Sequence, residues 1–254
     1  MPSNECVMKP EIRTHPNLED LSRAAAEYIC EIAEGAIKER GIFTFVLAGG
    51  STPRLLYEEL ASQPIASRID WQHTHLFWGD ERFLPPDHPD SNFFLAFKSL
   101  ISKVELPPAN INRISTEIGS IQAAAEGYEK TLRKFFLPAV GSEEEPYFPS
   151  FDVVLLGLGE DGHTASLFPC DAALEEKTKW AVAVDGSTAA PSIPRVSLTL
   201  PVLNEARHVV FLASGASKRK VFREILNNPE KTGYPAARVE PSGRLLWFID
   251  ELLA

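Results

Sequence analysis

The sequence predicts an α/β protein of the Rossmann-like kind, in which a mostly parallel sheet is covered by helices on both faces. Short apolar runs alternate along the chain with longer segments of helical periodicity, and this alternation is typical of βαβ units. The apolar runs are nearly continuous, which is typical of strands that are buried on both faces. We find no internal repeat and no low-complexity linker, so residues 1–254 are expected to form a single domain.

The first elements are marked by their ends as well as by their periodicity. Residues 17–40 carry one apolar stripe at helical spacing, with Asn17 placed to cap the start and Gly41 to end the helix. The short apolar run at 42–47 is expected to be a strand. The helix predicted after it, over 53–60, begins with a proline, which is a favoured first helical residue.

The rest of the chain continues the same alternation. We predict strands at 74–79, 151–156, 181–184, 208–212 and 245–249, helices at 91–101, 121–136 and 216–226, and loops at 80–92 and 138–150. In a parallel sheet, ligands bind outside the carboxyl ends of the strands. The glycine-rich turns that follow residues 47 and 156 are therefore expected to line the same edge.

Composition narrows the possible partners and compartments. The chain has 25 Lys+Arg and 35 Asp+Glu, a net charge of −10, which argues against general nucleic-acid binding and requires a locally basic pocket for any anionic substrate. The sequence contains no run of 18 apolar residues, so no membrane span is predicted. Residues 1–10 lack the apolar core of a signal peptide. Cys6, Cys30 and Cys170 are too scattered for a disulfide framework. We therefore expect a reducing compartment, the cytoplasm.

The turn after the strand at 42–47 has the features of a phosphate cradle. It consists of Gly49, Gly50, Ser51 and Thr52, directly before the predicted helix. Glycines let backbone N–H groups face a ligand, and the helix start and the two hydroxyls add further donors. It is not a Walker A loop, because no Gly-Lys-Ser/Thr follows. The alternative is a tight turn in which a hydroxyl only caps the helix.

A second glycine-rich turn occupies residues 157–164 and has the sequence Gly-Leu-Gly-Glu-Asp-Gly-His-Thr. It matches the G-x-G-x-x-G pattern of dinucleotide-binding domains, and Asp185 lies about where such a domain places its acidic residue. Pro169, however, would interrupt the long helix that the pattern requires. A nucleotide is therefore not expected at this turn.

Within this turn, Asp161 and His163 are two residues apart, so an extended turn would present both side chains to a ligand. A carboxylate beside an imidazole favours one tautomer and stabilises the imidazolium, which allows the histidine to move protons. One alternative is a capped turn with a structural histidine. Another is a metal pair, but no third or fourth ligand lies at a convincing spacing, and no metal is expected.

Charged residues follow the strand predicted at 74–79. Asp80, Glu81 and Arg82 would carry charge to the ligand edge of the sheet, or else form a solvated, self-neutralising turn. His73 and His75 flank the start of the same strand, but two histidines are a weak metal signal.

Two further cations are candidates for binding an anion. Arg195 offers a bidentate fork for phosphate and Lys218 a point charge. Lys218 falls in the first turn of the helix predicted at 216–226, where the helix dipole opposes a cation. That unfavourable position favours a functional role over simple surface charge.

Taken together, these segments resemble the 6-phosphogluconolactonase family. The resemblance runs from roughly the first helix to the C-terminus, and it is carried by residues 47–53, 78–82, 157–169, 195–203, 215–218 and 243–250. The family shares its sugar-phosphate-isomerase type of fold with glucosamine-6-phosphate deaminases, in which a Glu follows the histidine of the turn by five residues. Phe168 stands at that position here and cannot do carboxylate chemistry, which favours a lactonase.

The resemblance implies hydrolysis of 6-phospho-D-glucono-1,5-lactone to 6-phospho-D-gluconate in the oxidative pentose phosphate pathway, with no cofactor. On that basis we expect His163 to activate water, Asp161 to orient His163, and Arg82 or a backbone N–H of the 157–162 turn to stabilise the oxyanion. Substrate binding is assigned to Gly49, Gly50, Ser51, Thr52, Asp80, Arg195 and Lys218.

The expected partner is a small phosphorylated sugar lactone, bound by a monomer or weak dimer, with no nucleic acid and no membrane involved. Two other functions remain open. One is a sugar-phosphate deaminase or isomerase on the same fold, and the other is a sensor that binds a sugar phosphate without catalysis.

Overall fold

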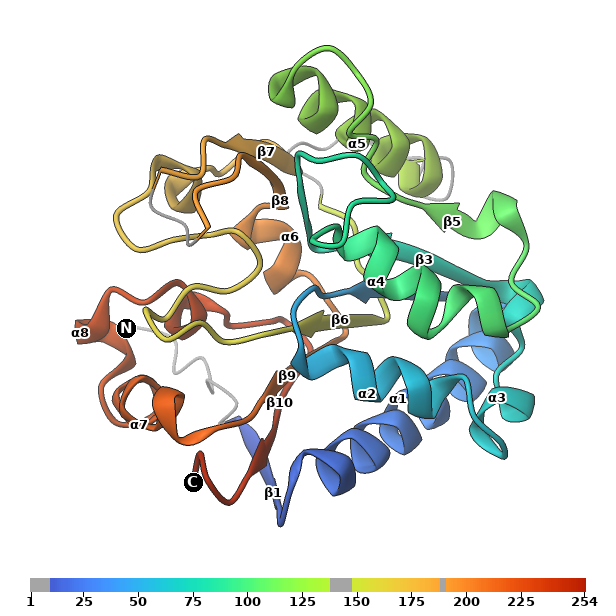
Figure 1. Cartoon of the computed structure of the whole chain (residues 1–254), viewed down its shortest axis with the longest axis horizontal. Helices are drawn as coiled ribbons and strands as arrows, with labels where there is room; N and C mark the ends of the chain where they lie inside the picture. The colour runs from blue at the N-terminus through green and yellow to red at the C-terminus, as the bar shows by residue number, and fades with distance from the viewer. Residues whose placement is uncertain (1–9, 138–147, 188–190) are drawn as a thin grey trace, which may run out of the picture.

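Seven parallel strands form the central sheet of the protein (Figure 1). The structure is a computed structural model and describes residues 10–137, 148–187 and 191–254. Every neighbouring pair in the sheet is parallel, which confirms the predicted fold class. The strands across the sheet are, in order, β1 (Glu11–His15), β10 (Arg244–Asp250), β9 (His208–Ala213), β6 (Val153–Leu156), β2 (Phe43–Leu47), β3 (Thr74–Trp78) and β5 (Ile111–Asn112).

A second, antiparallel sheet of three strands continues from the first, in the order β4 (Asp80–Arg82), β8 (Arg195–Leu198) and β7 (Ala181–Val184). Gly79 joins the two sheets, because its N–H donates to Leu47 at 2.9 Å while its carbonyl accepts from Leu198 at 2.8 Å. The prediction of a loop over 80–92 was therefore wrong at its start. The strand predicted at 181–184 is confirmed, but it belongs to this smaller sheet.

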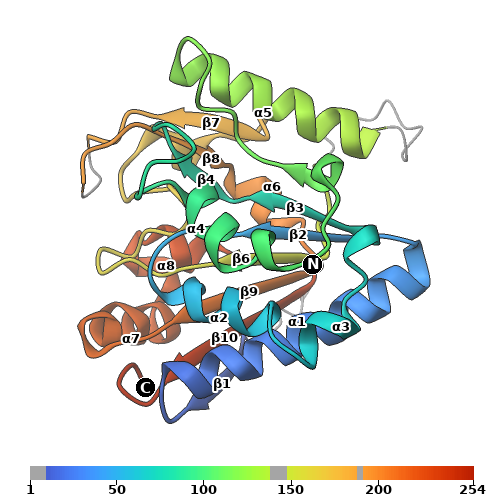
Figure 2. The ribbon, with the colours of Figure 1, turned by 45° about the vertical axis from the view of Figure 1, so that its right-hand side comes forward.

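Helices cover both faces of the central sheet, and Figure 2 shows the strands lying between α5 and α1. Adjacent residues of one strand confirm this arrangement. Trp247 contacts Phe222 of α7, whereas Phe248 contacts Tyr28 of α1. The helices are α1 (Leu18–Arg40), α2 (Thr52–Leu60), α3 (Ile65–Arg68), α4 (Asn92–Ser99), α5 (Ile121–Phe136), α6 (Leu200–Asn204), α7 (Arg219–Asn227) and α8 (Pro229–Thr232).

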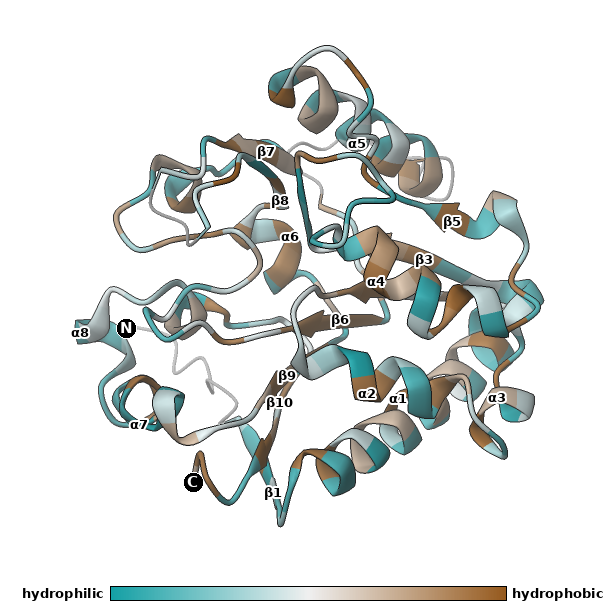
Figure 3. Ribbon diagram, in the orientation of Figure 1, coloured by the Kyte–Doolittle hydropathy of each residue, from teal (hydrophilic) through white to brown (hydrophobic). Residues whose placement is uncertain are grey.

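The strands form the apolar centre of the molecule, as the brown ribbons of β6, β9 and β10 in Figure 3 indicate. Every residue of β2 and β6 is buried, as the continuous apolar runs predicted. Cys30 of α1 lies in this core, and Cys170 is exposed. Cys6 lies outside the described residues.

The predicted ends of several elements are confirmed and others shift. The side chain of Asn17 accepts the N–H of Asp20 at 2.8 Å, and Gly41 ends α1 in the left-handed region. The helix predicted at 216–226 begins as a 3-10 turn over Ala216–Lys218 before α7. The strands β1, β5 and β8 were not predicted. Of the loop predicted at 138–150, residues 138–147 lie outside the described residues.

No helix among the described residues is both long and apolar enough to cross a membrane.

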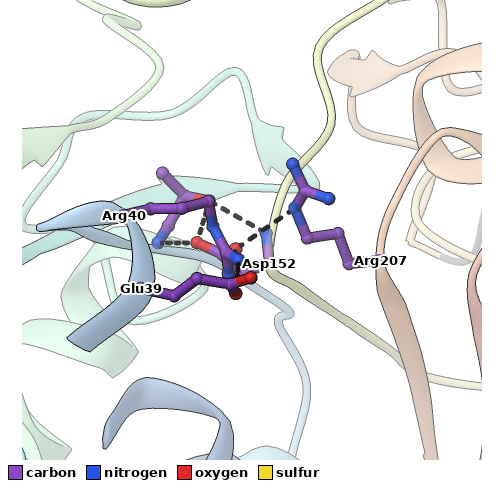
Figure 4. A network of polar contacts seen from close by, with 5 residues as sticks. Glu39, Arg40, Asp152 and Arg207 are labelled. Carbon is purple, nitrogen blue, oxygen red and sulfur yellow. Dashed lines mark hydrogen bonds and ion pairs between the residues drawn. The ribbon is translucent and has the colours of Figure 1, made fainter. Parts of the chain in front are cut away.

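A buried carboxylate joins several elements at the amino end of the central sheet (Figure 4). Asp152, 3% exposed, accepts the backbone N–H and the hydroxyl of Thr44 at 2.8 and 2.9 Å. It also pairs with Arg40 at 2.7 Å and with Arg207 at 3.5 Å, and Glu39 pairs with Arg40 in turn. The network connects α1, β2, β6 and the start of β9 at the amino end of the sheet.

Candidate active site

The carboxyl ends of four neighbouring strands, β9, β6, β2 and β3, open onto one cavity of about 290 Å³. Both glycine-rich turns line it, as predicted from the order of the strands. Of the residues assigned to the site from sequence, all but Asp161 line the cavity. The predicted residues that line it are Gly49, Gly50, Ser51, Thr52, Asp80, Arg82, His163, Arg195 and Lys218.

The turn after β6 holds a histidine against a carboxylate. The ring Nδ1 of His163 lies 2.5 Å from Oδ1 of Asp161, and the backbone N–H of His163 donates to the same oxygen at 3.1 Å. The N–H of Gly159 donates to the carbonyl of His163 at 2.9 Å, which closes the turn. Asp161 does not line the cavity itself and contacts the lining at His163.

The protonation of this pair follows from the two partners. Burial alone would raise the pKa of Asp161, but the hydrogen bond and charge of His163 outweigh it and lower the pKa. An ionised carboxylate can only accept, so Nδ1 of His163 carries the proton in this contact. In the neutral ring Nε2 is then the unprotonated nitrogen, available to accept a proton from a group in the cavity.

The back of the same turn is packed against an aromatic ring. A Cβ on Gly162 would lie 2.4 Å from the ring of Tyr234, so only glycine fits there. The carbonyl of Gly162 accepts the N–H of Ala236 at 3.1 Å, and the hydroxyl of Tyr234 donates to Glu224 of α7 at 2.7 Å. These contacts fix the turn from behind, and no local sequence pattern predicts them.

The turn after β2 leaves the start of α2 without a side-chain cap. Ser51 is the N-cap residue of α2, yet its side chain makes no capping hydrogen bond, and Thr52 is the first residue of the helix. A Cβ on Gly49 would lie 1.9 Å from the side-chain oxygen of Asn92, so this turn passes directly over that amide. These features favour the anion cradle over a turn that is capped by its own hydroxyl.

Two arginines face each other across the smaller sheet. Arg82 of β4 and Arg195 of β8 are directly opposed partners in the antiparallel register, an arrangement that is unfavourable for like charges. The Nε of each is buried without a partner among the described residues. Within the described residues their side chains donate hydrogen bonds to carbonyls, from Arg82 to Asp90 at 2.6 Å and from Arg195 to Pro191 at 3.3 Å.

Arg195 is only 4% exposed, and its burial lowers its pKa from the ordinary arginine value. Its guanidinium lies 5.6 Å from the ring centre of Phe168, and that ring lies 4.7 Å from the ring of His163. A buried cation with an unused donor beside a second cation is an arrangement that an anionic ligand would complete.

Asp80 is buried and already has partners on both of its carboxylate oxygens. Ser166 donates its hydroxyl to Oδ2 at 2.6 Å, and Asn92 donates its amide to Oδ1 at 3.3 Å. Asp80 therefore holds the loop after β6 and the start of α4 against β4. Neither Asn92, which lines the cavity, nor Ser166 was identified from the sequence, because no local pattern shows that Asp80, 12 and 86 positions away, is their partner.

Lys218 lies at the β9 end of the cavity, just before α7. Burial lowers its pKa, while the negative charges of Glu160 and Asp250 act in the opposite direction. Glu160 also lines the cavity and was not singled out from the sequence. The ammonium has no hydrogen bond or ion pair within residues 10–137, 148–187 and 191–254, so its donors remain available.

No metal site is evident in the described part of the chain, where three or more His, Cys, Asp or Glu side chains nowhere gather in a group that could hold an ion. His73 pairs with Asp70 at 2.8 Å and His75 packs against Phe135, so the two histidines near β3 have separate structural partners.

Comparison with known proteins gives one consistent result. The family model described as glucosamine-6-phosphate isomerases/6-phosphogluconolactonase matches residues 16–247. A protein of Nostoc sp. named 6-phosphogluconolactonase is 37% identical over 246 residues, covering 96% of both chains. One of the same name from Synechocystis sp. is 39% identical over 247 residues, covering 96% of this chain and 97% of its own.

Solved structures agree with these relatives. The 6-phosphogluconolactonase of Thermotoga maritima superposes with a TM-score of 0.81 at 32% identity, covering 96% of this chain and all of its own. That of Trypanosoma brucei superposes with a TM-score of 0.85 at 31% identity, covering 97% and 98% of the two chains. A monomeric glucosamine-6-phosphate deaminase shares the fold with a TM-score of 0.77 at 20% identity, covering 96% and 98%.

Proposed function

The chain belongs to the glucosamine-6-phosphate isomerase and 6-phosphogluconolactonase family, and from that premise we propose that it is a 6-phosphogluconolactonase. It hydrolyses 6-phospho-D-glucono-1,5-lactone to 6-phospho-D-gluconate, the ester-opening step of the oxidative pentose phosphate pathway. The observation that carries the proposal is one cavity lined by three cations, an open helix start and a histidine that a carboxylate holds from outside the lining.

The histidine–carboxylate pair supplies the base. Because Asp161 occupies Nδ1 of His163, Nε2 is the nitrogen that takes a proton from water as its oxygen attacks the lactone carbonyl. The carbonyl carbon becomes tetrahedral and its oxygen negative. When the bond from that carbon to the ring oxygen breaks, His163 returns the proton to the ring oxygen, which becomes the free hydroxyl of the product.

The oxyanion of the tetrahedral intermediate needs a donor in the cavity. Arg82 and the backbone N–H groups of the 157–162 turn are the candidates, since Arg82 and residues 157–160 of that turn line the cavity with His163. One such donor contributes about 3–4 kcal/mol to the stabilisation of the transition state. Water attack on an ester needs a base, an oxyanion donor and a proton for the leaving oxygen, so we propose a reaction without a metal or nucleotide.

The phosphate of the substrate is assigned to the remaining cationic and donor groups. Ser51 and Thr52 offer hydroxyls at the uncapped start of α2, Lys218 a point charge, and Arg195 a buried guanidinium. Binding energy from this remote group orients the lactone carbonyl toward His163. Asp80 supports the site by holding its loops.

A deaminase or isomerase reaction on this fold is disfavoured by one side chain. Phe168 is 1% exposed and lies against His163, where a carboxylate would be needed for acid–base chemistry on an amino sugar. A sensor without catalysis is disfavoured by the oriented pair of Asp161 and His163, which binding alone does not require.

The deciding experiment is a lactonase assay on freshly generated 6-phosphogluconolactone, corrected for spontaneous ring opening. We expect turnover well above the spontaneous rate, and no ammonia from glucosamine 6-phosphate. Tight binding of 6-phosphogluconate without turnover would instead identify a sensor. Equal hydrolysis of the unphosphorylated lactone would overturn the phosphate assignment.

We further propose that the protein works in the cytoplasm as a monomer or weak dimer, with a small phosphorylated lactone as its partner. The net charge of −10 supports the absence of nucleic acid from this list, since the only basic cluster assigned a role lies inside the cavity.

A further inference from the structure

We propose that Asp250 is a positioning residue for phosphate binding, because it fixes the turn that presents Lys218 to the cavity. The inference rests on the proposed function, in which Lys218 holds the phosphate. Asp250 is the last residue of β10, and it does not line the cavity itself.

The carboxylate of Asp250 is buried and is fully used in organising this turn. It is 3% exposed. Its Oδ2 accepts the hydroxyl of Ser214 at 2.5 Å, and its two oxygens share the N–H of Gly215 at 3.1 and 3.2 Å. Oδ1 also accepts the N–H of Leu253 at 2.9 Å. One side chain therefore pins the end of β9 to the end of β10.

The geometry of the turn carries this constraint to Lys218. The N–H of Lys218 donates to the carbonyl of Gly215 at 3.3 Å, so the residue held by Asp250 closes the 3-10 turn that ends at Lys218. On the far side, the guanidinium of Arg219 donates to the carbonyls of Leu252 and Glu251 at 3.0 and 3.5 Å. The turn is thus fixed at its beginning and just after its end by residues 250–252.

The charge of Asp250 works in the same direction as its geometry. Burial disfavours the ammonium of Lys218, and the negative charge of Asp250 offsets part of that effect. Because Asp250 makes no ion pair with Lys218, the ammonium stays available for a phosphate. A neutral residue at 250 would lose the charge and, if it were Asn, would turn an amide donor toward the N–H of Gly215.

A purely structural role for Asp250 predicts a different outcome from a positioning role. A structural residue would lower the stability of the fold and affect every substrate alike. A positioning residue for phosphate binding would affect the phosphorylated lactone selectively, and would raise KM more than it lowers kcat.

The test compares 6-phosphogluconolactone with unphosphorylated glucono-1,5-lactone in the full-length wild type, Asp250→Asn and Ser214→Ala. For Asp250→Asn we expect the ratio of kcat/KM for the two lactones to fall about tenfold, mostly through KM, as for a weakened charge-assisted contact. Ser214→Ala keeps the charge and should lower the ratio about twofold to threefold. Asp152→Asn removes another buried carboxylate, far from the turn, and serves as the matched control.

The outcomes separate this inference from the proposed function. A wild type that does not prefer the phosphorylated lactone refutes the phosphate assignment itself. A wild type with that preference, but an Asp250→Asn ratio equal to that of Asp152→Asn, refutes only the role of Asp250. If Asp250→Asn does not fold, Ser214→Ala and Arg219→Gln decide, and an unchanged ratio in both overturns the inference.

Discussion

The two ends of the central sheet both bury charged groups, but at the carboxyl end two arginines are left incompletely hydrogen-bonded. At the amino end, Asp152 accepts two hydrogen bonds from Thr44 and pairs with Arg40 and Arg207 (Figure 4). At the carboxyl end, Arg82 and Arg195 oppose each other, and the Nε of each is buried without a partner among the described residues.

From this difference we infer which charges stabilise the fold and which are placed for a ligand. A buried charge with complete partners holds its elements together, whereas a buried donor without a partner costs about 1–3 kcal/mol. The amino end therefore contributes to stability. The carboxyl end holds unused donors on Arg82 and Arg195, together with the ammonium of Lys218, and a phosphorylated substrate would supply the missing acceptors.

The largest expected effect separates catalysis from stability at the carboxyl end. His163→Ala removes the base and should lower kcat by about a thousandfold, within the usual range for acid–base catalysis. The product 6-phosphogluconate should still bind, and the free energy of unfolding should change little, since His163 is partly exposed. Stopped assays measure kcat, and a thermal melt measures the change in stability. Near-normal kcat in this variant would reject His163 as the base.

The second prediction concerns the amino end, where we expect a substitution to lower stability and leave activity unchanged. Asp152→Ala leaves the N–H of Thr44 without its acceptor and Arg40 and Arg207 without their counter-charge. We expect a loss of about 2–4 kcal/mol in the free energy of unfolding, moderated because both arginines are partly exposed. The ratio kcat/KM should stay within about twofold of wild type, since the substitution removes no transition-state contact. Urea unfolding checks the first value, and a large loss of activity in the folded variant would contradict the comparison.

The third prediction tests the unsatisfied arginines. Arg195→Met keeps the length and apolar contacts of the side chain but removes one of two opposed charges. Replacing a poorly compensated buried charge by an apolar residue is often neutral or stabilising, so the free energy of unfolding should not fall. KM for the phosphorylated lactone should rise about tenfold to a hundredfold. A destabilised variant with normal KM would mean that Arg195 serves the fold instead of the ligand.

The fold was predictable to the extent that each element carries its own signal. The apolar stripe and caps of α1 and the buried run of β2 are local properties, and both were identified with nearly correct ends. β4 has three residues in a segment rich in Asp and Pro, and β8 lies far along the chain. Such short strands exist because of their pairing partner, which no local pattern reveals.

The features of the site also divide into those that a local sequence pattern predicts and those that depend on distant partners. The two glycine turns could be placed on one edge because the carboxyl ends of parallel strands share an edge. The opposition of Arg82 and Arg195 requires the register of two distant strands, and the contact of Tyr234 with Gly162 requires the packing of a late segment on an early turn. Residue chemistry was therefore visible in the sequence, whereas the partners of each residue were not.

The smallest expected effect concerns the pH dependence of Lys218, the cation at the other end of the cavity from the arginine pair. Burial lowers its pKa, so as the pH rises the ammonium loses its proton at a lower pH than an ordinary lysine does. The affinity for 6-phosphogluconate should therefore be constant near neutral pH and decline as the pH rises toward 10, by about threefold to tenfold. Arginine stays charged over this range, so Lys218→Arg should remove the decline even if its affinity at neutral pH is lower. Calorimetric titrations of the product from pH 7 to 10, with Lys220→Arg as an exposed control in the adjoining helix α7, measure the difference. A decline that persists in Lys218→Arg would show that another group, and not this ammonium, sets the alkaline limit of phosphate binding.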